Sequence, residues 1–151
     1  MFNIKNILLP TDFSKLSLSA AQYAVDLAKQ YNAKIHLLHV IEKTPPILTI
    51  HSLDLSEEKI IKSIEDDARE SLNSTAAKLS EGGAEILTVL KKGLDYEEIV
   101  NYSQQNGTDV IVIATHGRTG ILHTLIGSVA EKVIRYAKCP VLVITPTGKE
   151  K

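Results

Sequence analysis

Hydrophobic positions along the chain follow two different periods, one typical of strands and one typical of helices. Short, nearly continuous apolar runs bounded by polar or turn-forming residues are typical of strands that are buried on both faces of a sheet. Such runs predict strands at Ile4–Leu9, Ala33–Ile41, Ala84–Leu90, Val110–Ala114 and Val141–Thr145.

Apolar residues at helical spacing fill most of the segments between these strands. The spacing predicts helices from Leu16 to Tyr31, from Ile60 to Leu79, from Asp95 to just before Gly107, and from about Ser128 to Ala137. Glu98 follows Asp95 at the spacing of a capping box, and Gly82-Gly83 marks the end of the second helix. The segment Glu42–Leu55 has little periodicity and contains Pro45-Pro46, so it is expected to be a loop.

The alternation of strands and helices with short connections predicts one α/β domain with a five-stranded, mostly parallel sheet covered by helices on both faces. Residues 1–147 are assigned to this domain and 148–151 to a polar tail. Ligands of such sheets bind beyond the carboxyl ends of the strands, where the strand order reverses. The segments to inspect are therefore Pro10-Thr11-Asp12, Val40-Ile41-Glu42, Lys91-Lys92-Gly93 and Ala114–Ser128.

Composition and net charge argue against nucleic acid and membranes as partners. The chain has 151 residues, of which 44% are hydrophobic and 23% charged, as in ordinary globular domains. A formal net charge of -1 provides no general attraction to nucleic acid or to an anionic membrane, so neither is expected as a partner. No apolar run suits a signal peptide or a spanning helix, and Cys139 is the single cysteine, so the expected compartment is the cytoplasm.

The stretch from Ala114 to Ser128, ATHGRTGILHTLIGS, joins the predicted fourth strand to the last helix and is rich in glycine and hydroxyl groups. A helix N-terminus presents unpaired N–H groups and roughly half a positive charge, which favours phosphate. Gly127 allows close approach to that terminus, Ser128 adds a hydroxyl, and Gly117-Arg118-Thr119-Gly120 can surround an anion with main-chain N–H groups. The residues alone leave a second interpretation open, because Ser128 and Glu131 also form an S-x-x-E capping box.

Several common sites are not supported. The chain lacks the P-loop sequence, and no G-x-G-x-x-G follows the first strand, which argues against a dinucleotide-binding fold. His36 and His39 are three apart on a strand and point to opposite faces, and His116 and His123 lack a third ligand, so no metal site is expected. Asp12 stands alone and no base is identifiable beside a nucleophile, so no catalytic residue is assigned.

The same glycine stretch resembles the signature of the universal stress protein family, G-x2-G-x9-G-[S/T], placed between the fourth strand and the last helix. In this chain the signature reads Ala114-x2-Gly117-x9-Gly127-Ser128. The segments ILLPTDFS, LLHVIE, GSVAEKVIR and CPVLVI also look typical of the family, and the resemblance covers nearly the whole chain. It implies a fold similar to flavodoxin-like and adenine-nucleotide-binding sheets.

The resemblance further implies that ATP, with or without Mg²⁺, binds at the edge of the sheet identified above. Asp12 and Val40 would contact the adenosine end, while Gly117, Gly127, Ser128 and Val129 would contact the ribose and phosphates. The complete set of expected ligand-binding residues is Pro10, Thr11, Asp12, Val40, Ala114, Thr115, Gly117, Arg118, Gly120, Gly127, Ser128 and Val129. Ala114 departs from the signature's first glycine and would weaken binding if that position needed positive φ or very close ligand approach.

Family members commonly dimerise by antiparallel pairing of the last strand, so the resemblance implies a homodimer through Val141–Thr145. The expected function is that of an ATP-binding stress-response or signalling module without robust catalysis. Two alternatives remain at this point: a dimeric interaction module with the same fold and no nucleotide, and a weak nucleotide hydrolase. The sequence does not identify a partner protein.

Overall fold

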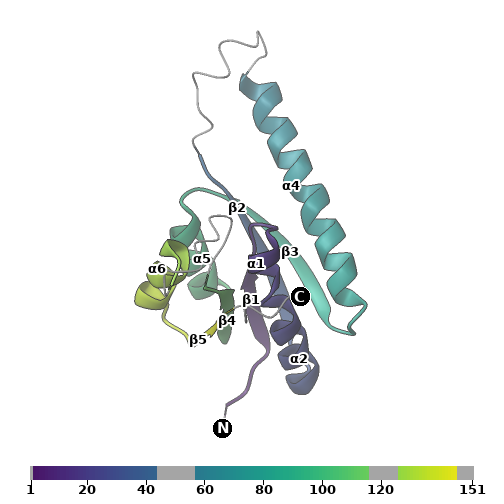
Figure 1. Cartoon of the computed structure of the whole chain (residues 1–151), viewed down its shortest axis with the longest axis vertical. Helices are drawn as coiled ribbons and strands as arrows, with labels where there is room; N and C mark the ends of the chain where they lie inside the picture. Colours follow the sequence, from purple (N-terminus) through teal and green to yellow (C-terminus); the bar gives the residue numbers. More distant parts are fainter. Residues whose placement is uncertain (1, 44–56, 116–125, 146–151) are drawn as a thin grey trace.

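A computed structural model describes residues 2–43, 57–115 and 126–145 of the chain (Figure 1). The strands are β1 (Asn6–Pro10), β2 (Lys34–Ile41), β3 (Glu85–Lys92), β4 (Val110–Ala114) and β5 (Val141–Ile144). The helices in the described ranges are α1 (Lys15–Leu18), α2 (Ala21–Tyr31), α4 (Glu57–Ser80), α5 (Asp95–Gln105) and α6 (Ser128–Tyr136).

All strand pairs are parallel, and the order across the sheet is β3-β2-β1-β4-β5. The predicted five-stranded parallel α/β fold is therefore confirmed. The chain builds outward from β1 to β3 and then returns to place β4 on the other side of β1. The strand order thus reverses between β1 and β4, which is the position where open α/β sheets bind ligands.

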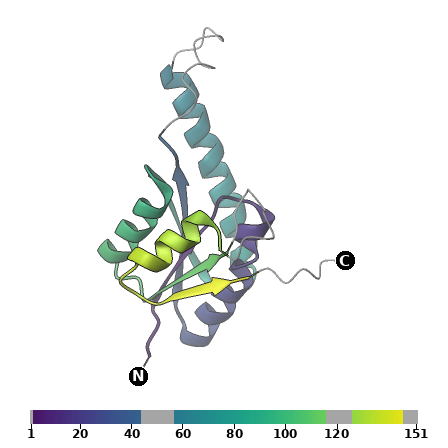
Figure 2. The ribbon, with the colours of Figure 1, turned by 60° about the vertical axis from the view of Figure 1, so that its left-hand side comes forward.

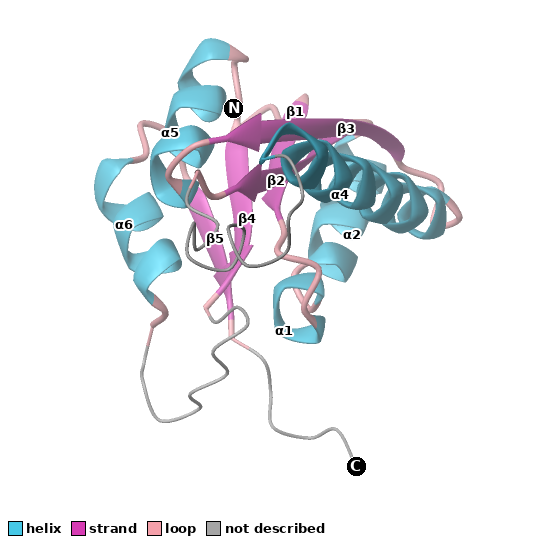
Figure 3. Ribbon diagram, turned by 90° about the horizontal axis from the view of Figure 1, so that it is seen from above, coloured by secondary structure: helices cyan, strands magenta, loops and turns pink. Residues whose placement is uncertain are grey.

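Helices cover both faces of this sheet (Figure 3). On one face, α2 and α4 pack through small and branched residues such as Ala24, Val25 and Leu72. On the other face, α5 and α6 contribute Ile99 and Val133 to a second core cluster. Burial on both sides accounts for the nearly continuous apolar sequences of the central strands.

One predicted helix is divided into two. The spacing predicts a single helix over residues 16–31, but α1 ends at Leu18 and α2 begins at Ala21. The hydroxyl and the main-chain N–H of Ser19 both donate to the Leu16 carbonyl, at 2.6 and 3.2 Å. The Ser19 N–H also keeps the regular helical bond to the Lys15 carbonyl at 3.0 Å, and the chain then tightens to a three-residue spacing, where the Ala20 N–H donates to the Ser17 carbonyl at 3.4 Å.

The predicted capping box at the start of α5 is wrong. The N-cap residue is Leu94, which supplies no side-chain cap, and Asp95 is already the first helical residue. The Asp95 carboxylate instead accepts a hydrogen bond from the adjacent Tyr96 N–H at 2.7 Å. The acidic residue still lies in the first turn, where it interacts favourably with the helix dipole.

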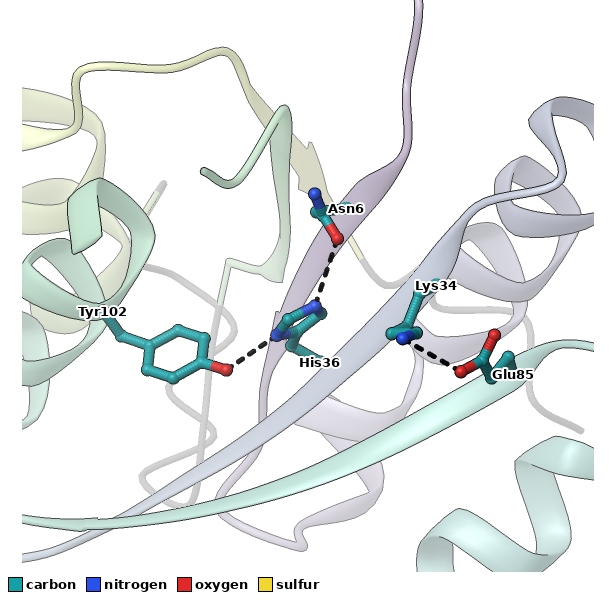
Figure 4. A network of polar contacts seen from close by, with 5 residues as sticks. All are labelled: Asn6, Lys34, His36, Glu85 and Tyr102. Atoms are coloured by element: carbon teal, nitrogen blue, oxygen red, sulfur yellow. Dashed lines mark hydrogen bonds and ion pairs between the residues drawn. The ribbon is translucent and has the colours of Figure 1, made fainter. Parts of the chain in front are cut away.

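The two strand histidines point to opposite faces of the sheet, as predicted. His36 lies on the α5 face, where its Nδ1 is 2.7 Å from the Tyr102 hydroxyl and its Nε2 is 3.3 Å from Asn6 Oδ1 (Figure 4). Since the Asn6 amide nitrogen donates to Gly107, Asn6 Oδ1 is the acceptor. Neutral His36 therefore donates from Nε2 and accepts the Tyr102 hydroxyl proton at Nδ1, an assignment that follows from the network.

Burial, assisted by nearby Lys34 and opposed by Glu85, lowers the pKa of His36 below its usual 6.5. The unfolded chain therefore binds a proton before the folded chain does, and stability falls as the pH drops below about 6.5. We expect the free energy of unfolding to decline less between pH 7.5 and 5 in His36→Gln than in the unmodified protein. Denaturant unfolding at both pH values measures this difference, and parallel declines would show that His36 makes no contribution.

Candidate functional site

A pocket of about 970 Å³ opens at the carboxyl ends of β1, β2 and β4, within the size range typical of small-molecule sites. It contains nine of the residues predicted from the sequence: Pro10, Thr11, Asp12, Val40, Ala114, Thr115, Gly127, Ser128 and Val129. The predicted Gly117, Arg118 and Gly120 lie outside the described residues. The structure therefore brings together predicted residues from three strand ends and from the start of α6.

Hydrogen bonds to β2 and within the turn hold the turn after β1 in place. The Thr11 N–H donates to the Leu38 carbonyl at 2.9 Å. The Thr11 hydroxyl accepts from the Phe13 N–H at 3.0 Å, and the Asp12 carboxylate accepts from the Ser14 N–H at 2.9 Å. Asp12 is thus held at the pocket by a turn in which its Oδ1 has a structural role.

Phe13 adopts a φ of 66°, a left-handed conformation that is uncommon for a bulky side chain. The Phe13 ring packs against the His39 ring with centroids 4.4 Å apart. His39 Nδ1 lies 2.8 Å from the Thr11 carbonyl oxygen, so this nitrogen must carry the proton. Both side chains line the pocket, and His39 ties the end of β2 to the turn that carries Asp12.

Neither Phe13 nor His39 is among the site residues predicted from the sequence. Strand periodicity predicted the face that His39 occupies, because His36 and His39 must point in opposite directions. That pattern could have placed His39 beside the turn after β1. No comparable signal exists for Phe13, since its backbone conformation is imposed by the hydrogen bonds of the turn.

The first turn of α6 faces the same pocket. The helix begins with the bond from the Glu131 N–H to the Gly127 carbonyl, at 3.0 Å. The N–H groups of Ser128, Val129 and Ala130 therefore have no acceptor within the helix, and all three residues line the pocket. Main-chain donors and the positive end of the helix dipole meet at this position.

The capping-box interpretation of Ser128 is wrong. The N-cap residue is Gly127, without a side-chain cap, and Ser128 is the first residue of the helix. Glu131 does not reach back toward the N-cap but accepts a hydrogen bond from Arg135 at 3.0 Å. Because the expected structural role is absent, the Ser128 hydroxyl is not committed to capping its own helix.

Ala114, which replaces the first glycine of the signature, is a buried residue at the end of β4. It is not among the described non-glycine residues with positive φ, so its methyl group causes no backbone strain there. We expect Ala114→Gly to leave ligand affinity unchanged and to lower stability by about 0.5–1 kcal/mol, because glycine weakens a strand. Calorimetry and thermal melting measure the two quantities, and a marked change in affinity would show that the methyl group contacts the ligand.

Charge is distributed unevenly around the described pocket. Acidic residues border the side formed by α4 and the ends of β1–β3, and include Asp12, Glu42, Glu57, Glu65 and Asp67. Two lysines, Lys43 and Lys92, also line that side, and Lys92 forms an ion pair with Glu65. A further carboxylate, Asp95, lines the pocket from the start of α5. The described lining from β4 and α6, residues 113–115 and 127–130, carries no charged side chain. An anionic group is therefore favoured at the α6 side and disfavoured at the α4 side.

Metal-binding and membrane-spanning features do not occur in the described part of the chain. Within residues 2–43, 57–115 and 126–145, no three His, Cys, Asp or Glu side chains are grouped so that they could hold a metal ion. In the same ranges, no helix has the length and apolar character needed to cross a membrane. His116 and His123, considered for metal binding, lie outside the described residues.

Comparisons with known proteins agree with the fold. Residues 3–145 match the family model described as the universal stress protein family. Universal stress protein MJ0531 of Methanocaldococcus jannaschii is 36% identical over 146 residues, covering 97% of this chain and 85% of that protein. The solved structure of MJ0577 superposes with a TM-score of 0.83 at 27% identity, covering 97% of this chain and 99% of that one.

Two more distant structures carry ligands. A universal stress protein in complex with cAMP has a TM-score of 0.69 at 22% identity and covers 96% of this chain and 99% of its own. The universal stress protein of Archaeoglobus fulgidus in complex with dAMP has a TM-score of 0.65 at 22% identity and covers 95% of this chain and 99% of its own. At these identities the similarity establishes the shared fold.

Proposed function

Because the chain belongs to the universal stress protein family, we propose that its pocket binds an adenine nucleotide and that ATP is its ligand. The observation that carries this proposal is the position of the Ser128, Val129 and Ala130 N–H groups, which border the same pocket as Asp12 and Val40. One ligand can therefore meet both sets of residues. The bound cAMP and dAMP of two proteins with this fold support the choice of an adenine nucleotide.

The distribution of charge orients the proposed ligand. Phosphates lie at the start of α6, where main-chain donors favour an anion. Gly117, Arg118 and Gly120, which lie outside the described residues, are expected from the family signature to contact the same phosphates. The base and ribose lie toward β1 and β2, where Val40 provides an apolar contact. The Asp12 carboxylate only accepts hydrogen bonds, so it pairs with ribose hydroxyls or with the adenine amine and repels phosphate.

The proposed activity is binding without robust turnover, which makes the protein a nucleotide-responsive stress or signalling module. The sequence assigns no catalytic residue to this pocket, and Mg²⁺ is expected only in company with the phosphates of ATP. Bound nucleotide stabilises the folded chain by mass action. It also connects the turn after β1 with α6, and in this way can alter the surface that a partner protein contacts.

The proposal includes a homodimer formed by antiparallel pairing of β5 with its copy. β5 is the last strand at one side of the described sheet, next to α6 (Figure 2). Leu142 on β5 is 38% exposed, and Ile134 and Tyr136 on α6 are also exposed. An apolar strand at a sheet edge is a ready template for pairing, and pairing with an identical strand gives a closed, twofold dimer.

The nucleotide content of the protein tests this function. Freshly purified protein is denatured and its supernatant is analysed for nucleotide, after which nucleotide-free protein is titrated calorimetrically with ATP, cAMP and GTP, with and without Mg²⁺. We expect intact ATP in the supernatant and tighter binding of ATP than of GTP. Absence of both nucleotide and heat would favour an interaction module with an empty pocket, and rapid conversion to ADP would favour a hydrolase.

A further inference from the structure

β3, the strand at the opposite edge of the sheet from β5, has the features of an edge strand that can pair with a strand of another molecule. It is the terminal strand of the described sheet and contains eight residues, which is long for an edge strand. Natural edge strands usually avoid pairing through prolines, bulges or charges within the strand. In β3 the segment from Ile86 to Leu90 contains none of these, and Leu87 is 46% exposed. Figure 3 shows β3 at one margin of the sheet.

The hydrogen-bonding direction of β3 follows from its register. The Gly93 N–H donates to the Ile41 carbonyl of β2 at 3.0 Å. Because successive residues of a strand direct their main-chain groups to opposite sides, residues 85, 87, 89 and 91 face β2. Ile86, Thr88 and Leu90 therefore direct their N–H and C=O groups outward, away from the sheet.

The side chains of β3 are self-complementary about Thr88. In an antiparallel pair of two β3 strands centred there, Glu85 lies opposite Lys91 of the second copy, and Leu87 lies opposite its Val89. On the other face, Ile86 lies opposite Leu90. The two Thr88 residues meet on the axis, where the main-chain N–H of each donates to the main-chain carbonyl of the other. Both charged pairs are attractive, and the residues between them are apolar or hydroxylated.

Other registers do not have this property. Centring the pair on Val89 places Lys91 opposite Leu87 and leaves Glu85 opposite Gly93. Centring it on Leu87 places Glu85 opposite Val89. Only the Thr88 register pairs both charges, and opposite charges directly across two strands are favourable. Glu85 already contacts Lys34 at 3.0 Å, but its side chain is 71% exposed and can accept a second cation.

We propose that β3 is a second self-association surface, at which two copies of this chain pair antiparallel about a twofold axis at Thr88. The occupant of the edge is another copy, because the strand carries the complement of its own charge pattern. This surface lies at the opposite side of the sheet from β5. Together with the β5 contact proposed above, a second twofold contact would build assemblies larger than a dimer, in which the proposed nucleotide-binding units join edge to edge.

Charge-reversal variants test this contact by sedimentation across a range of protein concentrations. Glu85→Lys places two lysines opposite each other, and Lys91→Glu places two glutamates opposite each other. Each single variant should weaken the β3-dependent association step by about tenfold or more. An equimolar mixture of the two variants should restore it, because each lysine of the first variant then meets a glutamate of the second across the pair. This recovery cannot arise if a variant has merely failed to fold.

A main-chain variant tests the register independently. Thr88→Pro removes an outward N–H from the centre of the pair and leaves the ladder to β2 intact. Thr88→Val retains the N–H and serves as the matched control. We expect the proline variant to lose the association step and the valine variant to keep it. A wild-type mass independent of concentration, or variants and a mixture that sediment as the wild type does, would overturn the proposal.

Discussion

Ser128→Pro is expected to weaken ATP binding by on the order of 100-fold or more without loss of the fold. Proline at the first position of a helix removes an N–H that has no helical acceptor and is structurally favoured there. The preceding Gly127 has φ -69° and ψ 157°, which is the conformation that a residue before proline prefers. The proposed phosphate contact loses one main-chain donor and one hydroxyl, and hydrogen bonds to charged groups are worth about 1.5–3 kcal/mol each.

Ser128→Ala is the matched control, because it removes only the hydroxyl and retains the N–H. We expect it to lose less affinity than the proline variant, with melting temperatures of both variants close to that of the wild type. Calorimetric titration with ATP and thermal melting of the nucleotide-free proteins provide the comparison. Unchanged affinity in Ser128→Pro would show that the start of α6 does not bind phosphate.

Asp12→Asn is expected to reduce ATP affinity by on the order of tenfold or more, through loss of a charged acceptor for the ribose or base. The amide oxygen can still accept the bond from the Ser14 N–H, which the Asp12 carboxylate accepts at 2.9 Å. The turn after β1 should therefore retain its shape. Binding of inorganic triphosphate to the same variant should not weaken, since Asp12 is proposed to lie away from the phosphates.

Titrating Asp12→Asn with ATP and with inorganic triphosphate separates contacts at the adenosine end of the site from contacts at the phosphate end. If Asp12→Asn reduced the binding of ATP and inorganic triphosphate equally, the proposed orientation of the ligand would be wrong. Ser128→Pro should weaken both ligands, because its effect lies at the phosphate end. Ser128→Pro should therefore weaken both ATP and inorganic triphosphate, whereas Asp12→Asn should weaken only ATP.

The architecture was predictable because apolar periodicity reports burial directly. The central strands are covered on both faces, so their sequences are nearly all apolar, and β1, β2 and β4 lie where these runs predicted them. The position of the pocket followed from the same reasoning, since parallel strands present their carboxyl ends at one edge. Strand order was not predictable, because periodicity carries no information about which strands are neighbours.

Local features of the helix starts were not predictable from spacing. Asp95 and Ser128 both stand three residues before a glutamate, yet each is the first residue of its helix instead of the cap. A capping box requires the first residue to lie outside the helix, and a sequence pattern does not determine that boundary. Similarly, the break after α1 lies where the Ala20 N–H bonds the carbonyl three residues back, which apolar spacing does not report.

The conformation of Phe13 shows a further limit. Its φ of 66° depends on the Thr11 hydroxyl, the Asp12 carboxylate and packing on His39, which come from two strand ends. Strained residues often occur at binding sites, where surrounding contacts hold them. Such a feature becomes visible only when segments distant in sequence are placed side by side.

The most direct test of the central claim is a crystal structure grown with saturating ATP. We predict that phosphate oxygens lie within hydrogen-bonding distance of the Ser128, Val129 and Ala130 N–H groups, with the adenosine toward Asp12 and Val40. A pocket that contained only solvent, or an ATP molecule with its phosphates against α4, would contradict the account.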